Sequence, residues 1–175
     1  PGAARAYDFQ PTAAEWAGWP EQCKARFVVT NIGRTSEYVN SISRDVTDLW
    51  QARLGECFGM LHHHCAGLVH LERARSAVSQ NAREFELDNA VTEHTYAAGY
   101  CPRSNPFWSN IEANLSIVYA EQGNLGKSLL TLDEAVAAHP DYDGSYIAKS
   151  IVLKRAGKAA ESRTALIEGS KATAQ

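Results

Sequence analysis

The sequence predicts an all-α protein, and three observations support that class. Apolar residues recur at three- and four-residue steps along most of the chain, which is the spacing of one helix face. The alternation of apolar and polar residues that marks strands is almost absent. The segment 109–140 also aligns without a gap on 143–169, so that position 109 corresponds to position 143, which indicates a repeated unit. With 175 residues, 45% of them hydrophobic, the chain is expected to form a single helical domain over 1–175.

The segment 1–56 is expected to form an extended arm and two non-repeat helices. The arm covers 1–11, where two prolines disfavour a helix. In 12–56, Thr12 caps a first helix that an internal proline interrupts and that ends near Gly33. A second, short helix covers 43–54, beginning at a capping serine and stopped by the glycine that follows. These helices precede the part of the chain in which the repeat is visible.

The repeat itself places similar residues at matching positions of two helix-turn-helix units. In the first unit these are Leu115, Tyr119, Gly123, Ser128, Leu132, Ala135 and Pro140. In the second they are Lys149, Leu153, Gly157, Ser162, Leu166 and Gly169, of which Lys149 is a poor match. The glycines allow a tight turn between antiparallel helices, and the small residues allow two helices to approach closely.

At these positions the chain resembles the tetratricopeptide repeat family. The resemblance covers 105–142 and 143–174 as two repeats, and 57–104 as a degenerate earlier copy with helices over 57–78 and 83–99. It implies an alpha-alpha superhelix of helical hairpins that binds other proteins or peptides, usually in its concave groove. The resemblance brings no catalytic residues, and the sequence has no GxSxG, P-loop or HExxH motif, so we do not expect an enzyme.

The composition of the chain limits the classes of partner that are expected. The 17 Lys and Arg are spread along the chain and are outnumbered by 20 acids, so nucleic acid is not expected as a partner. No apolar stretch reaches the roughly 20 residues that span a bilayer. Three classes remain: a module that binds a peptide or partner helix, a structural subunit that stacks on copies of itself, and a helical protein that binds a metal.

Four cysteines without CxxC spacing indicate disulfides formed in an oxidising compartment, although four buried reduced thiols are an alternative. The chain begins at Pro1 rather than Met, which we interpret as a mature product whose leader was removed; a shortened chain would look the same. The expected location is therefore periplasmic or extracellular. In a helical hairpin of the implied kind, the start of one helix lies beside the end of the next. Cys57 is therefore expected to pair with Cys101, which leaves Cys23 for Cys65.

Four histidines and a cysteine occur in LHHHCAGLVH, residues 61–70. At 100° per residue, consecutive histidines point in different directions and cannot all bind one ion. His62 and Cys65 have ligand spacing and His94 could supply a third group, but no fourth ligand is evident, so we expect packing and neither a metal nor a cofactor. His63 and His70 fall together on the side with small residues. They are expected to line the concave groove, where their replacement by alanine would alter binding and leave the thermal midpoint nearly unchanged.

The two ends of the chain suggest self-assembly. A solenoid exposes the apolar side of its last repeat unless a polar helix covers it, and here Leu166 and Ile167 border such an end. We expect the N-terminal arm, through Tyr7 and Phe9, to dock on a neighbouring copy, and a contact of this kind propagates as a filament unless it closes a ring. The alternative is a monomer whose arm folds back on its own first helices.

Overall fold

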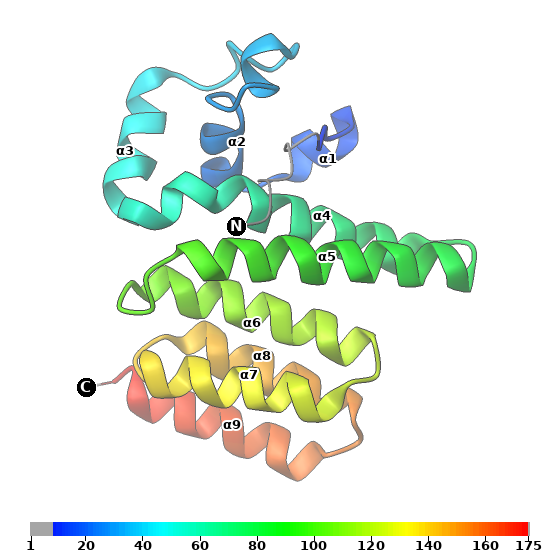
Figure 1. Ribbon diagram of the computed structural model, residues 1–175. Helices are drawn as coiled ribbons and strands as arrows, with labels where there is room; N and C mark the ends of the chain where they lie inside the picture. Colours follow the sequence, from blue (N-terminus) through cyan, green and yellow to red (C-terminus); the bar gives the residue numbers. More distant parts are fainter. Residues whose placement is uncertain (1–8, 175) are drawn as a thin grey trace.

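The computed structural model describes residues 9–174, and this part of the chain consists of helices joined by turns and loops (Figure 1). The predicted all-α class is confirmed. The helices are α1 (Ala13–Gly18), α2 (Glu21–Phe27), α3 (Arg44–Leu54), α4 (Leu61–Ser76), α5 (Gln80–Tyr100), α6 (Pro106–Glu121), α7 (Leu125–Ala138), α8 (Asp143–Arg155) and α9 (Ala159–Ala172). Short 3₁₀ turns cover Gly33–Thr35 and Gly55–Met60. No helix within 9–174 is both long enough and apolar enough to cross a bilayer.

The helices from α4 onward form three hairpins that lie one beside the next. The pairs are α4 with α5, α6 with α7, and α8 with α9, and α6 contacts both α5 and α8 (Figure 1). Gly123 and Gly157 make the turns inside the second and third hairpins, with φ of 81° and 76°. A side chain at either position would be strained, because L-residues other than glycine rarely adopt this left-handed backbone. The two turn glycines hold equivalent positions in their hairpins, as the repeat predicts.

The N-terminal helices differ from the prediction in number and length. The expected first helix is divided into α1 and α2, because Pro20 begins a new helix as the N-cap of α2. It also ends at Phe27 instead of near Gly33: a Cβ on Gly33 would lie 1.9 Å from the Phe27 carbonyl oxygen, so the chain folds tightly back there. The predicted capping residues of α1 and α3 are confirmed. Thr12 forms a capping box with α1, and the Ser43 side chain accepts a hydrogen bond at the start of α3.

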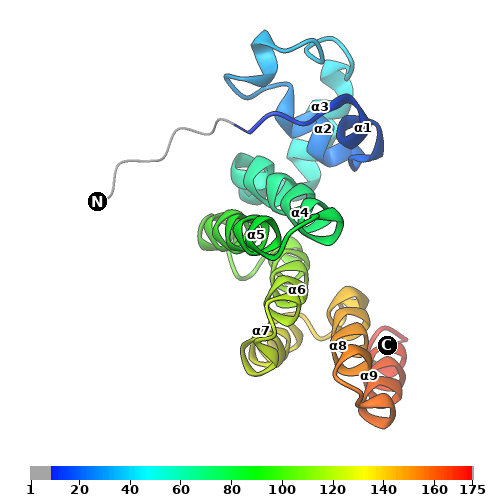
Figure 2. The same ribbon diagram turned by 90° about the vertical axis from the view of Figure 1, so that its right-hand side faces the viewer.

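Helix α4 lies in the middle of the molecule. The N-terminal helices lie on one side of it, and α5 and α6 lie on the other (Figure 2). Every residue of 61–67 is therefore buried, so the start of α4 has no solvent-facing side. The chain enters α4 through the 3₁₀ turn at 55–60, which replaces the first turn of the helix expected from residue 57.

One carboxylate connects the three hairpins. Glu121, at the end of α6, accepts hydrogen bonds from Arg75 of α4 at 3.2 Å, from Arg83 of α5 at 2.9 Å, and from Arg155 of α8. Its side chain is 14% exposed. Burial raises the pKa of Glu121, but the bonds and charges of Arg155 and Arg75 outweigh burial, so the pKa is lowered and the group stays ionised. A charge network of this kind fixes the relative placement of the hairpins.

Candidate functional site

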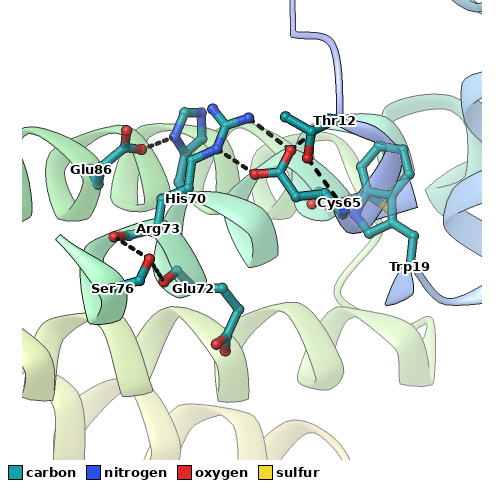
Figure 3. A network of polar contacts seen from close by, with 9 residues as sticks. Thr12, Trp19, Cys65, His70, Glu72, Arg73, Ser76 and Glu86 are labelled. Carbon is teal, nitrogen blue, oxygen red and sulfur yellow. Dashed lines mark hydrogen bonds and ion pairs between the residues drawn. The ribbon is translucent and has the colours of Figure 1, made fainter. Parts of the chain in front are cut away.

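His63 and His70 lie between α4 and α5. His63 Nδ1 is 2.6 Å from an oxygen of Glu93, and His70 Nδ1 is 2.5 Å from an oxygen of Glu86, both on α5. The two histidine side chains are only 11% and 13% exposed. Figure 3 shows His70 pointing at Glu86, with Arg73 beside it. The predicted placement in an open groove is therefore wrong.

The physical reason is the position of α5. A helical wheel gives the direction of a side chain on its own helix but not which neighbour covers that direction. Here α5 runs along the side that carries the small residues of α4. Replacing both histidines by alanine would leave the two glutamates without these partners, so an unchanged thermal midpoint is not expected.

His64 and His94 form a fully buried pair across the same helix contact. Their Nδ1 atoms are 3.1 Å apart, so one ring donates and the other accepts. Burial lowers the pKa of His64 to about 3. Burial also lowers the pKa of His94 well below its usual value, and the charge of His64 is a second, smaller cause. Gly67 makes room for this pair, because a Cβ there would lie 2.8 Å from the His94 ring. Neutral, buried imidazoles serve here as packing groups.

The arrangement does not fit the metal site weighed from the sequence. Cys65 is bonded to Cys23 and has no thiolate to offer. Within residues 9–174, no group of three or more His, Cys, Asp or Glu side chains is arranged to hold a metal ion. A closed zinc site requires about four such ligands.

The cysteines pair as expected. Cys57 is joined to Cys101, and Cys23 to Cys65. The first disulfide closes the hairpin of α4 and α5 at the end where α5 stops. The second joins α2 to α4 and so attaches the N-terminal helices to the hairpins. Cysteine pairs at disulfide distance are compatible with a protein outside the cytoplasm.

The predicted arm has one described aromatic member, Phe9, and it packs inside its own chain. Phe9 is 9% exposed and belongs to a core with Trp19, Cys23 and Phe27. Its ring lies 5.4 Å from His70 and 5.1 Å from the Arg73 guanidinium. The expected docking of Phe9 on a neighbouring copy is therefore wrong, because the ring is already buried against α4. Tyr7 lies outside the described residues.

Leu166 and Ile167 are exposed, as the assembly hypothesis requires, at 47% and 55%. The repeat explains Leu166. Leu132 holds the equivalent position in the preceding hairpin and is 0% exposed, because α8 packs on it with Ala148 and Val152. No described helix covers Leu166 in the same way.

Sequence reasoning missed two residues of this surface, Ile147 and Ile151 of α8, which are 47% and 39% exposed. They are the repeat equivalents of Ala113 and Ile117, which pack in the same core as Leu132. The repeat spacing could have found them. Ile147, Ile151 and Leu166 are called the end face below, since they correspond to residues that receive the next helix inside the molecule.

Similarity to known proteins adds nothing to this geometry. No protein-family model, no curated protein and no solved structure matches the chain.

Proposed function

We propose that this protein is a non-catalytic, tetratricopeptide-like interaction protein of the periplasm or cell exterior that assembles with copies of itself through the end face. The observation that carries the proposal is the contrast between Leu132, fully buried under α8, and Leu166, half exposed at the equivalent position. The end face thus has the chemistry of a helix-helix contact, and no helix within residues 9–174 packs on it. Exposed apolar groups gathered in this way are typical of protein interaction sites.

Charge supports a second copy as the occupant. Segment 143–174 contains six Lys and Arg and three Asp and Glu, whereas the whole chain has a net charge of −3, so the remainder is more acidic than the whole. Three of the six cations already form ion pairs within the chain, with Asp133, Glu121 and Glu161. The charge left for a partner is carried by the exposed Lys154, Arg163 and Lys171, and an acidic surface of another copy would match it. The outer side of α5 offers one: Glu84 and Asp88 are exposed there, next to Phe85, which is 65% exposed. Opposite charges on two surfaces direct the association of two copies and favour one relative orientation of them.

The contact joins two different surfaces, so it is heterologous. A heterologous contact builds an open filament unless its rotation closes a ring. The proposal keeps the self-assembly expected from the sequence but replaces its means, since Phe9 is committed to its own chain. The expected location follows from the disulfides, which persist in oxidising compartments.

The proposal predicts that mass rises with concentration. Light scattering of the wild type should detect species larger than the 19.1 kDa chain. Leu166→Lys should raise the protein concentration needed for association by at least about tenfold, because burying a charge in an apolar contact costs free energy. Leu130→Lys is the matched control. Leu130 is 61% exposed on α7 but lies outside the end face, so its replacement should leave association unchanged. A wild type that stays at one chain at high concentration contradicts self-assembly.

A further inference from the structure

A hollow of about 760 Å³ lies near the N-terminal helices, away from the end face. One wall is the end of α2 with the segment 28–42, and the other is α3 with the turn 55–60. The volume lies in the range of small-molecule sites in proteins.

The wall formed by 28–42 is held in place although it has little helix. The Thr30 hydroxyl donates to the Phe27 carbonyl at 2.7 Å and accepts from the Gly33 amide at 2.9 Å. Further along, Tyr38 stacks on Trp16 with ring centroids 4.2 Å apart. The hollow is therefore preformed, which reduces the entropy lost on binding.

Its lining combines apolar side chains with three arginines. The apolar residues are Val28, Val29, Val39, Ile42 and Phe58. The arginines are Arg26, Arg34 and Arg44, against two acids, Asp48 and Glu56. The lining thus carries more positive than negative charge.

The arginines differ in how they are engaged. Arg26 donates from Nε and Nη2 to the Gly59 carbonyl, at 3.0 and 2.8 Å. Arg44 is 3.7 Å from Asp48, and because both side chains are largely exposed this ion pair contributes little. The Arg34 side chain has no hydrogen bond or ion pair with any residue of the described part of the chain. Arg34 is therefore the guanidinium best able to take a ligand.

We propose that this hollow binds an organic anion with an apolar body, whose head is a carboxylate or a phosphate monoester. The head pairs with Arg34, since a guanidinium binds either oxyanion through two parallel hydrogen bonds. The apolar body lies against Val39, which is 36% exposed, and the half-buried Ile42, and this contact removes apolar surface of both partners from water. This site is independent of the end face and of self-assembly.

Isothermal titration calorimetry at pH 7.5 with octanoate, octyl phosphate and uncharged octanol tests the proposal. The two anions are used below their micelle concentrations and octanol below its solubility limit. We expect one anion or both to bind saturably with one site per chain, and octanol to bind at least tenfold more weakly. Arg34→Ala should weaken anion binding by about 10- to 100-fold, the effect of losing a charge-assisted hydrogen bond pair. Tighter binding of octanoate identifies a carboxylate ligand, and tighter binding of octyl phosphate identifies a phosphate.

Arg163→Ala is the matched control, because Arg163 is exposed on α9 and does not line the hollow. Circular dichroism establishes that both variants fold. The proposal is overturned if neither anion binds, if octanol binds as well as the anions, or if the two arginine variants behave alike. Leu166→Lys should bind the anions as the wild type does, so failure of self-assembly and failure of this site are separate results.

Discussion

Replacing Cys57 and Cys101 together by alanine is expected to lower the free energy of unfolding by about 4 kcal/mol. The bond links residues 44 positions apart, and closing a loop of that length restricts the unfolded chain by roughly this amount. For a domain of this size the thermal midpoint should fall by about 8–16 °C. Guanidinium unfolding followed by circular dichroism measures the change.

The Cys23 and Cys65 pair closes a loop of similar length, with a separation of 42, so its loss should cost a similar amount. The location of the damage should differ. Because this bond joins α2 to α4, its removal should increase amide exchange most strongly in α1, α2 and α3, whereas loss of Cys57–Cys101 should act on the hairpin of α4 and α5. Non-reducing peptide mapping provides the check on both. Free thiols at all four positions would contradict the disulfides and the oxidising location together.

Acid is expected to destabilise the protein strongly between pH 6.5 and 5, well above the range in which carboxylates usually matter. Burial lowers the pKa of His62 and of His64 to about 3, and lowers that of His94 well below 6.5. In this range these histidines are neutral in the folded protein and protonated in the unfolded chain. Unfolding therefore takes up protons, and the free energy of unfolding falls as the pH falls.

Glu112 acts in the opposite direction. Burial and the charge of Glu134 raise its pKa to about 7, so below pH 7 the folded protein holds a proton that the unfolded chain releases. Its contribution to stability is present at low pH and is lost as pH rises through 7. Against three histidines, one glutamate leaves a net uptake of about two protons near pH 5.5, or about 2–3 kcal/mol per pH unit. Glu15 and Glu121, whose pKa values are lowered, lose their contribution only below about pH 4.5.

Urea unfolding at pH 7.0, 6.0 and 5.5 measures this slope. His64→Gln keeps a hydrogen-bonding group without a titrating ring. The slope of the unfolding free energy against pH should therefore fall by the equivalent of about one proton taken up. Glu112→Gln should raise it by about one proton and should also make the protein more stable at pH 8. An unfolding free energy that stays constant between pH 7.0 and 5.5 in the wild type would show that the histidines do not remain neutral in the fold.

Local sequence determined the class and several exact positions in this protein. Thr12 and Ser43 cap the helices they were expected to cap, because a capping oxygen bonds to amides only two or three residues away. Gly123 and Gly157 make the turns because only glycine adopts that backbone without strain. The repeat spacing placed both, and the hairpin geometry that it implied led to the observed cysteine pairs.

The tertiary structure alone decided where side chains of α4 and the arm go. His63 and His70 were expected in a groove, yet α5 covers that side and supplies a glutamate to each. Phe9 was expected on a neighbouring copy, yet it is buried beside His70. Burial of a side chain depends on which element packs across it, and elements distant in sequence meet only in the folded chain. Equivalent leucines at 132 and 166 show the same principle: the residue type is identical, and the presence of α8 makes one of them core and leaves the other on the surface.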